Sequence, residues 1–255
     1  MVIRHLLFVV LAAGLVCGVP AFAQADVSVT QVKVDASATP FVTDGIDDLA
    51  FDASVAAGSF VCAIVSVTAS SRDFTSATDD GGNTYTLASQ GGVDATSSIA
   101  AVSEVWIYCA PISTTMQTVT VTLSNSVASP ALYALIEMDG QHGTTPIEDV
   151  AIATTNGTTH SSGNLVTAAA GSALIGIIYG TTGNYDQDAD FTAVAEDAQG
   201  LIGYDLVGAA TSTMEVTSAA TEDAVMAVIA VQPAAAAGGG NQGLLLGVGV
   251  PGDQS

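Results

Sequence analysis

Apolar and polar residues follow one another in short runs along most of the chain, which is the pattern of β-strands. TVTVTL (118–123) alternates residue by residue, as a strand with one solvent-exposed face does. ALYALIEM (131–138) and AVMAVIAV (224–231) are almost continuously apolar, which is typical of strands buried on both faces, although short buried helices have the same pattern. The pattern predicts strands over 27–35, 59–68, 84–89, 103–110, 117–124, 131–138, 147–154, 172–179, 191–196, 202–208, 213–218 and 224–232.

These runs are bounded by Gly, Asp, Asn and Ser, the residues that favour turns. No stretch has the caps and periodicity of an amphipathic helix of three turns. We therefore expect residues 26–232 to form an all-β fold, an antiparallel two-sheet sandwich of jelly-roll-like or immunoglobulin-like type.

The chain resembles itself at two places. AAGSFVCAIVSV (56–67) is similar to AAGSALIGIIYG (169–180), and the strands at 131–138 and 224–231 close the two stretches. We therefore expect an internal duplication with pseudo-repeats at about 50–140 and 160–232. Biased composition is the alternative, and one fused sandwich or two tandem ones are both compatible with the pattern.

The two ends differ in composition from the rest of the chain. Arg4 and His5 precede an apolar run (6–19) and small residues at 21–25, which predicts a secretory signal peptide over 1–25. The run is shorter than the ~20 residues that span a bilayer, so we expect a secreted or cell-surface protein without a membrane span in the mature chain; an uncleaved membrane anchor is the alternative. Residues 233–255 are expected to form a flexible Gly/Ala-rich tail carrying the apolar segment LLLGVGV (244–250), either disordered or able to add as a strand to a neighbouring subunit.

Two cysteines follow the predicted signal peptide, Cys62 and Cys109. An even pair in an exported protein predicts one disulfide; two buried free thiols in adjacent strands are the alternative. Trp106 lies in the same apolar segment as Cys109, and we expect it to pack against the bridge.

The charge is strongly negative, with 25 acidic residues, three Lys or Arg, and a formal net charge of −22. Such a surface repels phosphate backbones and anionic lipid, so nucleic acid is excluded as a partner. The carboxylates are either solvated, as suits a salty medium, or bind a divalent cation from outside.

Two acidic clusters could hold calcium, which prefers carboxylate oxygens. The first alternates like the start of a calcium loop, but Phe191 stands where the sharp-turn glycine is expected and an aspartate replaces the bidentate glutamate. For each cluster the sequence leaves two interpretations, a looser calcium site or a solvated acidic loop. We expect that the protein requires no cofactor. The candidate ligands are Asp186, Asp188, Asp190 and Asp197 in the first cluster, and Asp44, Asp47, Asp48 and Asp52 in the second.

Catalytic patterns are weak. After the signal peptide the histidines are His142 and His160, and no G-x-S-x-G nucleophile motif is present. We expect a protein that is not an enzyme and predict no catalytic residues.

The order of segments over about 50–232 resembles a β-sandwich module of bacterial surface and secreted proteins and of phage structural proteins. The resemblance rests on the apolar strand at 56–67, the D-x-x-G-N-x-Y turn DDGGNTY (79–85) and the strand that ends in EMDG (137–140). It implies a non-enzymatic structural or adhesive subunit of a cell or virion surface, whose partners are further copies or another surface protein. A calcium-assisted carbohydrate-binding module, with a glycan as partner, is the alternative; a polysaccharide-acting hydrolase is a third.

Overall fold

The computed structural model describes residues 26–35, 41, 45–68, 73–99, 103–125, 131–163, 165–166, 170–180, 184–187, 191–196, 199–207 and 211–235. All regular elements in these ranges are β-strands, and each of their pairings is antiparallel. No helix long and apolar enough to cross a membrane occurs in them. The predicted signal peptide and residues 236–255 of the predicted tail lie outside the described residues.

The first half of the described chain contains eleven strands. They are β1 (Ser28–Val34), β2 (Ile46–Val55), β3 (Phe60–Val67), β4 (Phe74–Asp79), β5 (Thr86–Leu87), β6 (Ser89–Gln90), β7 (Val93–Asp94), β8 (Thr96–Ile99), β9 (Ser103–Pro111), β10 (Met116–Leu123) and β11 (Ala131–Asp139). The second half contains β12 (Ile147–Ser161), β13 (Leu165–Val166), β14 (Ser172–Gly180), β15 (Tyr185–Gln187), β16 (Thr192–Glu196), β17 (Gly200–Val207), β18 (Thr211–Ser212) and β19 (Glu215–Val231).

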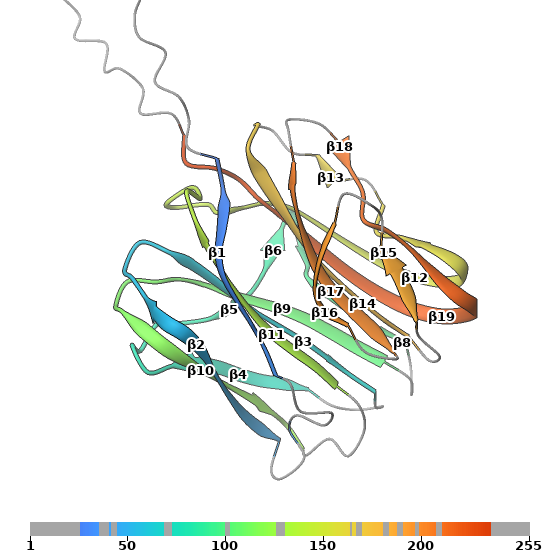
Figure 1. Cartoon of the computed structure of the whole chain (residues 1–255), viewed down its shortest axis with the longest axis horizontal. Helices are drawn as coiled ribbons and strands as arrows, with labels where there is room; N and C mark the ends of the chain where they lie inside the picture. Colours follow the sequence, from blue (N-terminus) through green and yellow to red (C-terminus); the bar gives the residue numbers. More distant parts are fainter. Residues whose placement is uncertain are drawn as a thin grey trace, which may run out of the picture.

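Within the described residues these strands build two six-stranded sheets that pack together, with smaller sheets around them (Figure 1). The first six-stranded sheet has the order β1-β11-β3-β9-β5, with β8 also on β9. The second has the order β12-β19-β14-β17-β16, with β15 also on β19. A three-stranded sheet, β2-β10-β4, covers the outer face of the first sheet. The predicted all-β antiparallel sandwich is confirmed.

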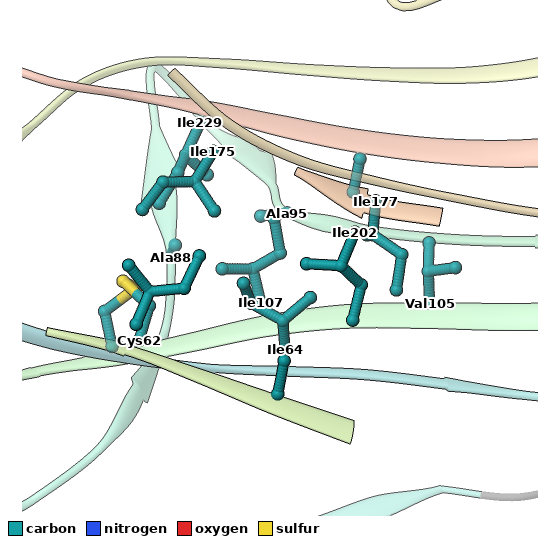
Figure 2. Close-up of a cluster of buried hydrophobic side chains, with 14 of the residues drawn as sticks. Cys62, Ile64, Ala88, Ala95, Val105, Ile107, Ile175, Ile177, Ile202 and Ile229 are labelled. Atoms are coloured by element: carbon teal, nitrogen blue, oxygen red, sulfur yellow. A yellow bond between two sulfur atoms is a disulfide. The ribbon is translucent and has the colours of Figure 1, made fainter. Parts of the chain in front are cut away.

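The central core lies between the two six-stranded sheets (Figure 2). Side chains of β3 and β9, such as Ile64 and Ile107, meet those of β14 and β19, such as Ile175 and Ile229. All four are fully buried. Burying an aliphatic side chain of this size contributes about 1.5–3 kcal/mol, so this shared core holds the two halves of the chain together.

Each six-stranded sheet is also covered on its other face. Odd-numbered residues of β3, such as Val61 and Val65, point into a second core beneath the three-stranded sheet. Even-numbered residues of β19, such as Met226 and Val228, point into a third core on the far side of the second sheet. Because both faces are covered, residues 131–138 and 224–231 are buried throughout, and the prediction that they are strands buried on both faces is confirmed.

The two six-stranded sheets share one strand arrangement. The order β1-β11-β3-β9 in the first sheet corresponds to β12-β19-β14-β17 in the second. In each sheet the last strand of the predicted repeat, β11 or β19, lies beside the strand that follows or contains the end of the Ala-Ala-Gly-Ser segment, β3 or β14. The register agrees as well: Ala131 pairs with Val67 in the first sheet, and Ala224 pairs with Gly180 in the second. β1 and β12 each carry a β-bulge near the start of the strand. An internal duplication would produce these agreements in strand order, register and bulge position. The duplication itself stays a prediction.

Several parts of the fold differ from the expected strands. β4 and β8 were not expected, the expected strand 84–89 is divided between β5 and β6, and the expected strand 147–154 continues to Ser161 in β12. β2 was not expected, because its sequence IDDLAFDASV was interpreted as an acidic cluster. The expected strands 213–218 and 224–232 form one continuous strand, β19, which remains paired with β12 at Glu222.

The expected position of Trp106 is wrong. Its ring lies in the core beneath the three-stranded sheet, 6.2 Å from the ring of Phe74, whereas Cys109 belongs to the central core. Residues three apart on a strand point to opposite faces, so Trp106 and the bridge are on opposite sides of β9.

Candidate functional site

A cleft of about 340 Å³ opens at one end of the sandwich, and we call it the end cleft. Its volume lies at the lower end of the range for ligand pockets. Three parts of the chain form it: the adjoining ends of β3 and β9, the turn from β5 to β6, and the loop that enters β12. The lining residues are Phe60, Thr86, Leu87, Ala88, Ser89, Gln90, Cys109, Pro111, Gly143, Thr144, Thr145, Pro146 and Ile147.

The loop that forms one wall of the end cleft is held by His142 and Gln232. The Nδ1 atom of His142 accepts hydrogen bonds from the backbone N–H groups of Thr144 and Thr145, at 3.4 and 3.2 Å. The side-chain amide of Gln232 donates to the carbonyl oxygen of Thr145, and its backbone N–H donates to that of Pro146 at 2.9 Å. The wall is therefore fixed to the residues that follow β19.

The opposite wall is held by the disulfide. Cys62 and Cys109 are bonded and lie directly opposite each other on β3 and β9, with their Cα atoms 4.1 Å apart. Cys62 is fully buried in the central core, while Cys109 reaches the cleft. The predicted disulfide is confirmed, and it cross-links the two strands that form this wall.

The lining of the end cleft consists of uncharged side chains. Leu87, Ala88, Pro111 and Ile147 supply apolar surface, and the hydroxyl and amide groups around them supply hydrogen bonds. In a chain of net charge −22, such a surface suits a neutral ligand that has both apolar and hydrogen-bonding groups.

The described members of the predicted cluster at residues 44–52 lie on β2 and point to different faces. Asp48 and Asp52 are exposed; Asp48 accepts a hydrogen bond from Thr120 Oγ1 at 2.6 Å, and Asp52 is ion-paired with Lys33 at 2.6 Å. Asp47 faces inward. Burial, together with the hydrogen bond and charge of Asp35, raises the pKa of Asp47 to about 7. Asp44 lies outside the described residues.

Of the predicted calcium cluster at residues 186–197, the structure describes Asp186 alone. It is exposed on β15, and its backbone carbonyl accepts a hydrogen bond from Thr217 Oγ1 at 3.5 Å. Asp188, Asp190 and Asp197 lie outside the described residues. In the part of the chain that the structure describes, no three His, Cys, Asp or Glu side chains lie close enough together to hold a metal ion. Calcium binding at either cluster stays a prediction.

A buried polar group around His160 was not anticipated from the sequence. Its Nε2 atom lies 3.0 Å from Ser218 Oγ, and its Nδ1 atom lies 2.6 Å from Thr155 Oγ1. Ser218 Oγ donates its own proton to the carbonyl oxygen of Ala220 at 2.8 Å, so the imidazole must donate to the serine and accept from the threonine. This direction is the reverse of that in a hydrolytic Ser–His pair, where the serine donates to the imidazole. The group therefore links β12 to β19, and burial lowers the pKa of His160.

The D-x-x-G-N-x-Y turn is organised by Asn83, which is buried. Its Nδ2 group donates to Asp79 and to the carbonyl oxygen of Thr114, both at 2.9 Å. Its Oδ1 atom accepts from the backbone N–H groups of Ser113 and Thr114, at 2.9 and 3.0 Å. Asn83 thus fastens the turn after β4 to the turn before β10, which is a structural role.

Comparison of the chain with protein-family models, with curated proteins and with solved structures found no match.

Proposed function

We propose that this protein is an exported, non-enzymatic structural or adhesive subunit of a cell or virion surface, and that it assembles with further copies of itself or with another surface protein. The observation that supports this most is the position of the two described chain ends. Val27 N–H donates to Gly171 O at 2.8 Å, and Ala234 N–H donates to Gly140 O at 2.6 Å. Both ends therefore leave the body at the same end of the sandwich (Figure 1).

Two glycines allow this close approach. Gly140 has a φ of +83°, and a Cβ atom on it would overlap the carbonyl oxygen of Asp26. Gly171 has a φ of +86°, and a Cβ atom there would overlap the carboxylate of Asp26. A body whose ends leave together can be attached to a surface or to a neighbouring copy at that end.

The test is the mass of the mature chain, starting at residue 26, measured by size-exclusion chromatography with light scattering. We expect an oligomer that falls to a monomer when residues 239–255 are removed. A monomer in both forms at high protein concentration, with and without calcium, would refute the self-assembly on which the proposal depends.

Carbohydrate binding is the second candidate, and the hydroxyl and amide groups that line the end cleft favour it. A glycan array probed with and without chelator tests it. Signal from a defined glycan would support this candidate, a loss of signal with chelator would add the calcium requirement, and silence in both conditions would remove it.

A further inference from the structure

The chain leaves the described body beside the end cleft. The described residues end at Ala235, and Gln232 is bonded to Thr145 and Pro146, two residues that line the cleft. The Thr145 Oγ1 atom accepts a second hydrogen bond from the Gln232 side chain at 3.1 Å. Hydrogen bonds therefore join the last described residues of the chain to the wall of the cleft.

The apolar segment 244–250 is within reach of the cleft. Residues 236–243, AAGGGNQG, separate it from Ala235. A Gly-rich linker of this length has a root-mean-square span of about 16 Å. The segment can therefore sample the end cleft of its own copy and, when two copies meet at this end, the cleft of the neighbour.

The segment and the cleft also match chemically. LLLGVGV carries no charge, and the cleft is lined by uncharged side chains with Leu87, Ala88, Pro111 and Ile147 as apolar surface. β5 forms one wall and is the last strand in the order of the first six-stranded sheet, so its outer backbone edge can accept an added strand.

We propose that the end cleft binds segment 244–250 of this chain, which adds along the edge of β5 and places its leucine side chains on the apolar surface. In the assembled form a second copy supplies the segment. That last part rests on the proposed function, whereas the contact between segment and cleft does not.

The test uses a fluorescent peptide of residues 240–252 and the mature chain carrying Leu245→Asp, which disables its own segment but keeps its full length. We expect saturable binding, measured by fluorescence anisotropy. The same peptide with Leu245→Asp should bind about tenfold more weakly or not at all, because it loses one buried leucine and places a charge on an apolar surface.

Two glycine variants of the acceptor locate the site. A Cβ atom on Gly143 meets no atom within 4 Å, so Gly143→Trp fills the cleft without backbone strain. Gly157 on β12 meets only ordinary contacts at 3.7 and 3.8 Å, so Gly157→Trp is the matched control away from the cleft. We expect Gly143→Trp to abolish peptide binding and Gly157→Trp to leave it unchanged, with both variants keeping the far-ultraviolet spectrum of the parent.

Three outcomes would overturn the inference: no peptide binding, binding that Gly143→Trp leaves intact, or a Gly157→Trp effect as large as that of Gly143→Trp. A cleft that rejects the peptide but binds a methyl glycoside would assign it to an outside ligand, which also overturns the inference. If the peptide binds as expected while the intact chain is monomeric by light scattering, the cleft contact stands and the proposed self-assembly fails.

Discussion

Breaking the bond between Cys62 and Cys109 should destabilise the whole described body. The two cysteines are 47 residues apart, and in the chain-entropy model closing such a loop stabilises the folded state by about 4 kcal/mol. For a chain of this length, that corresponds to a fall in melting temperature of about 8–16 °C. Because Cys62 lies in the central core, where both six-stranded sheets contribute side chains, we expect one cooperative transition and not a local one.

The assay is urea unfolding of the mature chain followed by tryptophan fluorescence and circular dichroism, with and without a phosphine reductant. The reduced protein should have a lower midpoint and a larger m-value, since its unfolded state is less compact. The double variant Cys62→Ala/Cys109→Ala is the control, and reductant should not change it further. Equal midpoints and equal m-values for the oxidised and reduced protein would refute the reasoning.

Three further predictions concern single side chains. Asp47 has a folded-state pKa of about 7, above its ordinary value of 3.8, so it stabilises the fold at low pH and loses this contribution as the pH rises towards and through 7. Asp47→Asn should therefore gain stability relative to the parent as the pH rises from about 4 to 7, measured as the free energy of unfolding in urea; a constant difference would contradict the shift. His160 has a lowered pKa, so the parent should lose stability as the pH falls below 6.5, the ordinary value, and His160→Gln should lose less over the same range; parallel pH profiles would contradict this. Asn83→Ala should cost about 1–3 kcal/mol, because it removes a buried amide that accepts from the backbone N–H groups of Ser113 and Thr114 and donates to Asp79 and to the Thr114 carbonyl; an unchanged urea midpoint would contradict this.

The strands that are apolar on both faces were predictable from the sequence, because burial on both sides leaves a continuous apolar run. Residues 131–138 and 224–231 are such runs, and both are strands. β2 was missed for the opposite reason. It buries Leu49 and Phe51 on one face and carries aspartates on the other, so its acidic composition concealed its alternation.

The pairing of Cys62 with Cys109 was also predictable, because these two cysteines follow the predicted signal peptide and leave one pairing. The end cleft was not. Its walls come from segments around residues 60, 88, 110 and 145, which meet only through the sheet order. The contact of His160 with Ser218 depends on the register of β12 against β19 across a bulge, and no local pattern specifies that register.

The most direct test of the account is disulfide trapping in the mature chain that carries Gly143→Cys and Leu245→Cys. Equal amounts of isotopically heavy and light protein are mixed, oxidised mildly, digested and analysed by mass spectrometry. The account predicts a peptide cross-linked between positions 143 and 245, including heavy–light pairs, alongside the native bridge between Cys62 and Cys109. Disulfides from position 245 to position 245 of a second copy or to the native cysteines, with none to position 143, would contradict it.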